Sequence, residues 1–221
     1  MDGTGRLFDR FVPNVPTGLQ PVKISYEAVA SQDYASLLKH VLQVTPKSES
    51  FIVVGESFSG PIAITLAAKA PNCSGVILAA SFARSPLPIP HWTSPLVGLM
   101  RHDLLPAVLI ESFLLNGESD VSLANELKQV LKTVPVSVIQ ERMRTVIGSN
   151  VIQDVRGLRV PVLYLQATHD RLVRQRSVSE IKQSALAATV VQITAPHMIL
   201  QTRPAACATA IGAWLMQTRS L

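Results

Sequence analysis

The sequence predicts an α/β fold in which a mostly parallel sheet is flanked by helices and carries a helical insertion. Short apolar segments rich in β-branched residues alternate with segments whose apolar residues recur at helical spacing. This alternation favours parallel strands joined by right-handed crossovers. Residues 85–150 begin with a proline-rich loop and then show helical patterns alone. We therefore predict a core formed by residues 1–84 and 151–221, with residues 85–150 as a helical cap over one edge of the sheet.

The composition suits a single domain of this class. The chain has 221 residues, of which 48% are hydrophobic and 16% are charged, which allows a sizeable core and is unlike a disordered chain. No apolar run is long enough to span a bilayer, and the first ten residues lack the apolar region of an export signal. Cys73 and Cys207 lie far apart in sequence and are expected to be reduced thiols. These features predict a cytoplasmic protein.

The net charge of +5 arises between residues 121 and 182, which contain ten basic and five acidic residues. Aromatic residues make up only 5% of the chain, and no nucleic-acid-binding module is recognisable, so a solvated basic face is favoured over nucleic-acid binding. An acidic partner, such as a carrier protein or an anionic substrate tail, is the alternative.

The core elements follow one another in chain order, and hydrophobic patterning identifies each. Residues 5–13 resemble a short helix that ends at prolines, and residues 22–26 lie at the centre of an alternating, β-rich strand. Residues 31–44 show helical spacing behind Ser31, which suits a helix cap. Another helix has Pro61 in its first turn, where a missing N–H costs little. The remaining core segments are four apolar strands and a closing helix: FIVV (51–54), SGVILAAS (74–81), VPVLYLQAT (160–168), ATVVQITA (188–195) and TRPAACATAIGAWLMQ (202–217).

The stretch FIVVGESFSG places Ser57 between a predicted strand and a predicted helix. A serine nucleophile needs a sharp turn that projects its oxygen from the carboxyl edge of the sheet, and small residues two positions away on each side permit this turn. Gly55 and Ser59 meet that need. The helix start also places the N–H of Phe58 where it can donate to a developing oxyanion. A plain glycine-serine turn between two elements is the alternative.

A serine hydroxyl needs a neighbouring base to take its proton. His197 is the favoured candidate because it directly follows the last predicted strand. Asp170 follows another strongly apolar strand, so it would lie at the same edge and could fix the tautomer of the imidazole. Asp154 is the fallback acid, and Glu56 is expected to bond local backbone groups instead. No motif suggests a metal ion or an organic cofactor.

Four segments of the chain resemble α/β-hydrolases of the serine esterase/lipase type. They are MDGTGRLF, VVGESFSGPIA, VPVLYLQATHDRLV and APHMILQTRP, and the chain order serine, aspartate, histidine is that of this superfamily. The resemblance implies Ser57 as nucleophile, His197 as general base and acid, and Asp170 as the residue that orients it. It also implies an acyl-enzyme on Ser57 that water releases, with the Phe58 N–H as one oxyanion donor. MDGTG is further similar to hydrolases and acyltransferases related to plant phytyl-ester synthases.

The N-terminus departs from the family pattern. Alignment through GTGRLF places the second oxyanion donor at Met1, with Asp2 adjacent, and indicates an N-terminally shortened fold that lacks the first three of the usual eight strands. The strand at residues 22–26 would then lose its neighbour, which leaves a gap beside residues 52–54. Either the two strands close up, or a partner chain fills the edge, or the reading frame is truncated. An exposed central strand edge promotes association, so we predict a homo-oligomer through that edge.

These observations predict a serine hydrolase that cleaves carboxylic esters of small to medium acyl chains, with a small-molecule ester as its partner. A thioesterase or acyltransferase of the same fold, or a weakly active hydrolase-like binding protein, are the alternatives. Some apolar residues of the insertion would line an acyl pocket, although simple packing explains them as well: Leu104, Leu105, Val108, Leu109, Phe113 and Leu114.

Overall fold

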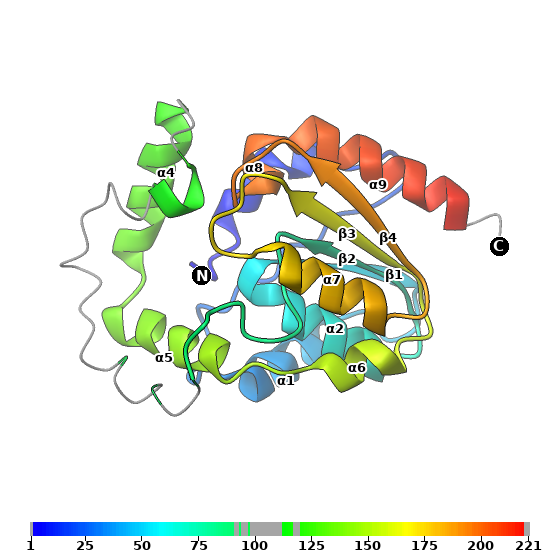
Figure 1. Cartoon of the computed structure of the whole chain (residues 1–221), viewed down its shortest axis with the longest axis horizontal. Coiled ribbons are helices and arrows are strands. Elements are labelled where there is room, and N and C mark those ends of the chain that lie inside the picture. The colour runs from blue at the N-terminus through cyan, green and yellow to red at the C-terminus, as the bar shows by residue number, and fades with distance from the viewer. Residues whose placement is uncertain (1, 91–92, 94–96, 98–111, 117–119, 219–221) are drawn as a thin grey trace.

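The computed structural model describes residues 2–90, 93, 97, 112–116 and 120–218 (Figure 1). In these residues a four-stranded sheet forms, and all its neighbouring strands pair in parallel. The strands follow one another in space as they do in sequence: β1 (Phe51–Glu56), β2 (Cys73–Ala79), β3 (Val162–Ala167) and β4 (Ala188–Ile193). The predicted α/β class with a parallel sheet is therefore confirmed, and β1 lies at one edge of the sheet.

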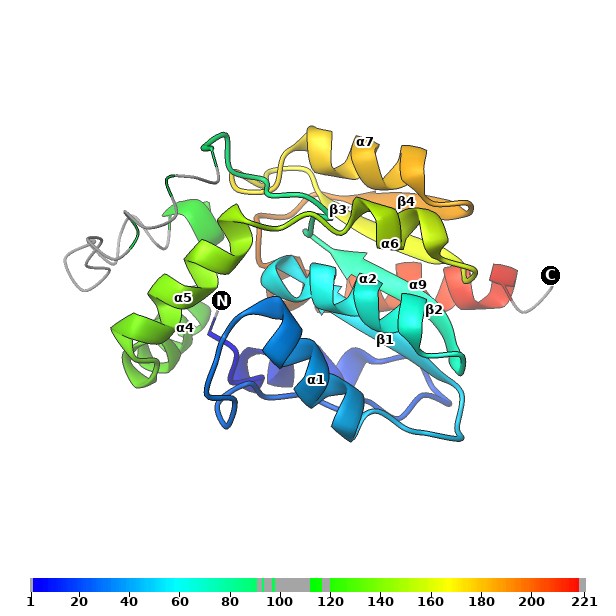
Figure 2. The same ribbon diagram turned by 90° about the horizontal axis from the view of Figure 1, so that it is seen from below.

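Helices cover both faces of the sheet (Figure 2). One layer consists of α1 (Tyr34–Val44), α2 (Gly60–Lys69), α6 (Ile152–Gly157) and α7 (Gln175–Ser184). Helices α2, α6 and α7 pack on the side chains of Val76, Leu78 and Val162, and α1 packs against α2. The opposite layer packs on Ile77 and Leu163 and consists of η1 (Arg6–Arg10), η2 (Val12–Asn14), α8 (Ile199–Thr202) and α9 (Pro204–Thr218). Because both faces are covered, the central strands read as nearly continuous apolar runs.

The predicted strand at residues 22–26 is wrong, because this segment contains no strand. Val22 is 77% exposed, and the N–H of Tyr26 donates to the carbonyl of Gly3 at 2.7 Å. A strand requires a neighbouring strand to pair with, and within the described residues β1 pairs with β2 alone. The segment is therefore irregular, and it leads from the exposed Val22 to the buried Tyr26.

The cap of α1 is Asp33, and the prediction of Ser31 is wrong by two residues. Asp33 has an extended backbone, and its carboxylate accepts from the N–H of Ser36 at 2.9 Å, which is the usual N-cap geometry. The hydroxyl of Ser31 donates instead to Asp33 and to Glu141.

Two helices of the insertion stand beyond the carboxyl ends of the strands, as Figure 1 shows. They are α4 (Val121–Thr133) and α5 (Val136–Ile147). The insertion joins the core at an antiparallel bridge between Arg84 and Asn150. Most of the two earlier helical patterns, at residues 95–102 and 104–115, lies outside the described residues. The division of the chain into a core (residues 1–84 and 151–221) and a helical cap insertion (residues 85–150) stays a prediction.

The buried side of α4 packs against the core through Leu123, Leu127 and Val130, which contact Leu7 and Met198. This contact places the insertion directly over the segment that follows β4. None of the helices in the described part of the chain combines the length and apolarity that a bilayer crossing requires.

Candidate active site

Ser57 occupies a strained turn between β1 and α2. Its backbone is left-handed, with φ of +50°, a conformation that costs free energy for a residue with a side chain. A short helical turn, η3 (Ser57–Ser59), leads into α2. A Cβ on Gly55 would lie 2.8 Å from the Cβ of Ala63 and 2.8 Å from the Cα of Gly60. Only glycine fits at position 55, so the sharp turn at Ser57 requires a small residue two positions before it.

The side chain of Ser81 lies close to Gly60 and stabilises the same turn. A Cβ on Gly60 would lie 1.7 Å from Oγ of Ser81, whose hydroxyl donates to the carbonyl of Ser57 at 2.7 Å. Gly60 itself has ordinary helical φ. Its missing side chain therefore makes room for Ser81, which hydrogen bonds the backbone of the strained serine.

The structure brings Ser57, His197 and Asp170 into one hydrogen-bonded chain. Nε2 of His197 lies 2.7 Å from Oγ of Ser57, and Nδ1 lies 2.8 Å from Oδ2 of Asp170. The other carboxylate oxygen, Oδ1, accepts from the N–H groups of Leu172 and Val173 at 2.7 and 2.9 Å. The three side chains follow β1, β4 and β3, so the parallel sheet gathers them at one edge.

This geometry sets the proton arrangement on the imidazole. A carboxylate only accepts hydrogen bonds, so Nδ1 of His197 carries the proton that Asp170 accepts. Nε2 is then free to accept from the hydroxyl of Ser57. The side chains of His197 and Asp170 are 5% and 2% exposed, which keeps water from competing for these contacts. A nucleophile, a base and an orienting carboxylate in this arrangement can carry out acyl transfer.

The fallback acid Asp154 lies elsewhere. It belongs to α6, and its carboxylate accepts from the hydroxyl of Thr65 on α2 at 2.6 Å. Asp154 therefore joins α6 to α2 through a hydrogen bond.

The prediction that Glu56 bonds local backbone groups is wrong, because its partners lie on α8. Its Oε1 accepts from the N–H of Leu200 at 3.3 Å, and its Oε2 accepts from Nε2 of Gln201 at 2.8 Å. Burial raises the pKa of Glu56, while Gln201 and His197 favour its charged form. Glu56 thus ties the turn at Ser57 to α8, directly after His197. No sequence motif reports a contact between segments 144 residues apart.

The residues expected to form the oxyanion hole are only partly described. Met1 lies outside the described residues. The carboxylate of Asp2 accepts from the N–H and the hydroxyl of Thr4 at 3.0 and 2.7 Å. Burial would raise the pKa of Asp2, but nearby positive charge and the Thr4 hydrogen bonds outweigh it, so this pKa lies below its usual value. Phe58 is buried, and its carbonyl accepts from the hydroxyl of Tyr34 at 3.1 Å.

A cavity of about 110 Å³ lies beside Ser57 and His197. Asp2, Glu56 and Gln201 contribute to its polar wall. The apolar wall combines core and insertion side chains: Leu7, Phe8, Ile24, Leu114, Leu127, Leu131, Leu172 and Met198. Of the residues expected to line an acyl pocket, Leu114 does so and Phe113 is largely exposed, whereas Leu104, Leu105, Val108 and Leu109 lie outside the described residues.

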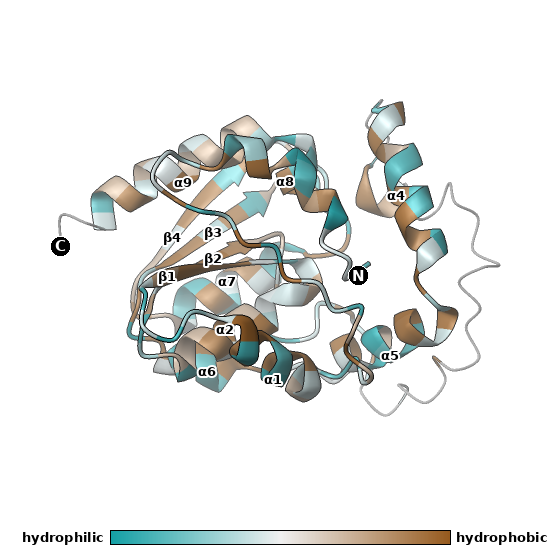
Figure 3. Ribbon diagram, turned by 180° about the vertical axis from the view of Figure 1, so that it is seen from behind, coloured by the Kyte–Doolittle hydropathy of each residue, from teal (hydrophilic) through white to brown (hydrophobic). Residues whose placement is uncertain are grey.

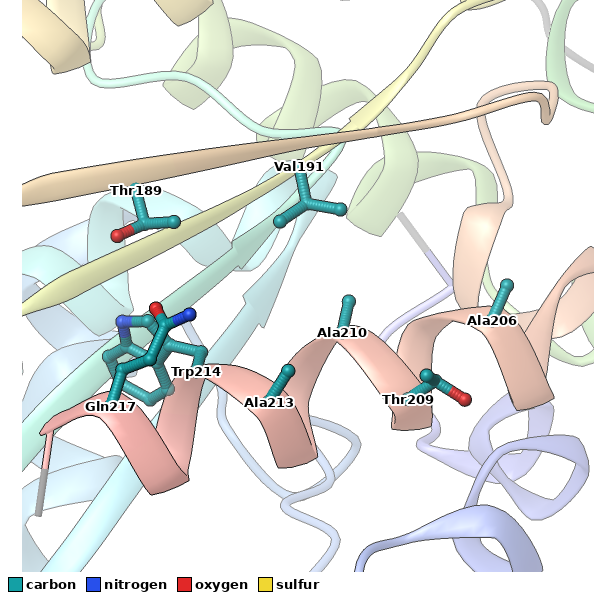
Figure 4. Close-up of a pocket in the computed structure, with 8 residues that line it drawn as sticks. All are labelled: Thr189, Val191, Ala206, Thr209, Ala210, Ala213, Trp214 and Gln217. Carbon is teal, nitrogen blue, oxygen red and sulfur yellow. The ribbon is translucent and has the colours of Figure 1, made fainter.

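A wider groove of about 430 Å³ lies between β4 and α9, away from Ser57 (Figure 4). Its lining contains alanines, threonines, Val191, Trp214 and Gln217, with no ionisable side chain. It therefore offers no base that could activate a threonine hydroxyl.

No group of three or more His, Cys, Asp and Glu side chains within the described ranges is arranged to hold a metal ion. Cys73 and Cys207 are both free and buried. Burial raises the pKa of Cys207 to about 12, so this thiol is a poor nucleophile.

Comparison with known proteins gives matches of two kinds. The model of the family Hydrolase_4, described as serine aminopeptidase S33, matches residues 22–200. A hydrolase from Oleispira antarctica superposes with a TM-score of 0.83 at 13% identity, covering 98% of this chain and 88% of that one. A hydrolase from Pseudomonas aeruginosa PA01 gives 0.82 at 16% identity, covering 97% and 86%. An esterase from Exiguobacterium antarcticum gives 0.81 at 11% identity, covering 97% and 88%. No match was found among curated proteins.

Proposed function

The chain belongs to the Hydrolase_4 (serine aminopeptidase S33) family of α/β-hydrolases, and from that membership we propose that it is a serine hydrolase that cleaves carboxylic esters of small to medium acyl chains. The observation that carries this proposal is the chain of contacts from Ser57 through His197 to Asp170, at 2.7 and 2.8 Å. A histidine held in this way can take the serine proton, which the chemistry of the nucleophile demands.

In the proposed reaction, Oγ of Ser57 attacks the ester carbonyl carbon while its proton passes to Nε2 of His197. The carbonyl oxygen becomes an oxyanion that the N–H of Phe58 stabilises, together with donors of the N-terminal segment around Asp2. The imidazolium then protonates the leaving alcohol, and the bond from carbon to the alcohol oxygen breaks. Water repeats the sequence on the acyl-enzyme and restores Ser57. Asp170 stabilises the imidazolium in both halves of the reaction.

The apolar lining of the cavity favours a substrate with an apolar acyl group. Its leucines, Phe8 and Met198 offer no hydrogen-bond partner beyond the backbone, so a hydrocarbon chain is a better occupant than a polar group. Leu127 and Leu131 come from the insertion, so the insertion contributes to the choice of acyl chain. The small volume of about 110 Å³ favours short chains over long ones.

The direct test compares hydrolysis of p-nitrophenyl butyrate by the wild type and by Ser57→Ala. We expect Ser57-dependent turnover in the wild type and only background hydrolysis in the variant. Equal rates in both proteins would overturn the enzyme proposal and favour the alternative of a hydrolase-like binding protein.

A peptide substrate is the second candidate, because the family description names an aminopeptidase. The same three residues would then cleave an amide bond. Alanine p-nitroanilide in the same assay separates the two, since an ester hydrolase leaves it largely uncleaved.

Thioesterase and acyltransferase activities would use the same three residues as ester hydrolysis. A thioesterase takes the acyl group from a thiol instead of an alcohol, and an acyltransferase passes it to an acceptor other than water. Product analysis with a thioester, and with added glycerol as acceptor, distinguishes them.

A further inference from the structure

Arg142 of the insertion is a buried cation beside the proposed oxyanion hole. It belongs to α5, and it is 1% exposed. Burial lowers its pKa, while the charge of Asp2 acts in the opposite direction. Burying a charge is unfavourable unless hydrogen bonds and opposite charges compensate for it, so a leucine or methionine would fill this space at lower cost. The guanidinium must therefore contribute something that an apolar side chain could not.

One contact of Arg142 orders the loop before α1. Its Nε and Nη2 both donate to Oε1 of Gln32, at 2.9 and 2.5 Å. The amide nitrogen of Gln32 in turn donates to the carbonyls of Tyr26, at 3.2 Å, and of Val29. Tyr26 continues the connection, because its hydroxyl donates to Oγ of Ser59, two residues after the serine nucleophile, at 3.2 Å.

Two further contacts join the guanidinium directly to Phe58 and to Gly3. The guanidinium carbon lies 5.9 Å from the centre of the Phe58 ring, within the range of a cation–π interaction. The guanidinium also lies flat against Gly3, where a Cβ would come within 2.4 Å of Nη2. Gly3 has φ of +62°, and its carbonyl accepts from the N–H of Tyr26 at 2.7 Å. Asp2, Gly3 and Phe58 all line the cavity beside Ser57.

From these contacts we infer that Arg142 is a positioning residue, which holds the Phe58 turn and the Asp2–Gly3 segment at the separation that oxyanion stabilisation requires. The inference rests on the proposed acyl transfer and adds a role for the insertion in it. Among the described contacts none joins Arg142 to Ser57, His197 or Asp170, and the proposed effect passes through Phe58, Gly3 and Gln32. Donors must lie about 2.7–3.1 Å from the oxyanion, and a misplacement of about 1 Å can lower a rate by about 10²-fold.

The test substitutes Arg142→Met and Arg142→Lys, with Arg144→Met as a matched control. Arg144 is exposed on the same helix. Each protein is titrated to completion with a fluorophosphonate, and kcat for p-nitrophenyl butyrate is expressed per labelled Ser57. This normalisation removes any unfolded fraction, so a merely structural role would leave the value unchanged.

We expect Arg142→Met to lower kcat per labelled site by about 10- to 100-fold with little change in KM. Arg142→Lys should fall between Arg142→Met and the wild type, because lysine keeps the charge but loses the planar, two-point contact with Gln32. Arg144→Met should match the wild type. Inhibition by a trifluoromethyl ketone, which binds serine as an oxyanion, should weaken in the same ratio as kcat/KM.

A kcat per labelled site within twofold of the wild type in Arg142→Met would overturn the inference. If that variant yields no folded protein, the same measurement on Arg142→Lys decides, and a value within twofold of the wild type overturns the inference there. Failure of the proposed function looks different, because the wild type itself would then show neither labelling nor Ser57-dependent turnover.

Discussion

Asp170 is the residue whose proposed role a single substitution tests most directly. Asp170→Asn keeps the side-chain shape but can donate to Nδ1 of His197, which favours the wrong imidazole tautomer. We expect kcat to fall by about 10²–10⁴-fold with little loss of thermal stability. The measurement is kcat together with the melting temperature of each variant.

Asp154→Asn is the matched control for this substitution. Asp154 contacts Thr65 between two helices, so its variant should keep nearly full activity. A larger loss of activity in Asp154→Asn than in Asp170→Asn would show that the acid is wrongly assigned.

The residues of the site divide into those that sequence could identify and those that it could not. Ser57, Asp170 and His197 were identifiable because each directly follows a predicted strand, and parallel strands end at one edge. The contact of Glu56 with Gln201 joins segments that no motif links. Arg142 carried a weaker signal, since it lies at helical spacing between buried Ile139 and Val146 and is thus a charged residue on an apolar helix face.

At the scale of elements, apolar patterning located every strand of the sheet but also suggested one that does not form. Strands β1 to β4 are apolar runs, and each finds a parallel neighbour. Residues 22–26 alternate apolar and polar side chains, a pattern that also suits a strand, but they have no neighbouring strand, and pairing depends on the whole fold. The opposite error concerns α7, where only Val178 and Ile181 are buried apolar residues, too few to make the helix evident.

The cap of α1 yields a prediction about stability. Hydrogen bonds from Ser31 and Ser36 lower the pKa of Asp33 from 3.8 to about 2. A lowered pKa means that the charged cap stabilises the fold fully above pH 3.8 and loses this effect as the pH falls toward 2. Asp33→Ala should therefore cost about 1 kcal/mol near neutral pH, and the difference from the wild type should shrink below pH 3.8.

Urea unfolding of both proteins between pH 3 and pH 7 measures this difference. Ser31→Ala provides the comparison, because Ser31 donates to Asp33 without capping the helix itself. A greater loss of stability in Ser31→Ala than in Asp33→Ala at pH 7 would contradict the assignment of the cap.

At the scale of the whole molecule, the edge of the sheet at β1 predicts self-association. Figure 3 shows β1 as a mostly hydrophobic strand at one end of the sheet, and Val54 on it is 42% exposed. Unpaired edge strands with apolar residues promote association with another strand. We expect sedimentation velocity to show a dimer or larger assembly, and Val54→Lys to shift it toward the monomer.

Val121→Lys is the control for surface charge in general, because Val121 is also exposed but lies on α4 in the insertion. It should leave the sedimentation coefficient unchanged. A wild-type protein that sediments strictly as a monomer would contradict the prediction. The cytoplasmic location and the absence of nucleic-acid binding likewise stay predictions from the sequence.

The central claim is that Ser57 is a nucleophile activated by His197 and Asp170. The most direct measurement is reaction with a fluorophosphonate followed by mass spectrometry of the labelled peptide, because it requires no knowledge of the natural substrate. We predict a single adduct on Ser57 in the wild type, much slower labelling in His197→Ala, and none in Ser57→Ala. An unlabelled Ser57 in folded wild-type protein, or equal labelling rates with and without His197, would contradict the claim.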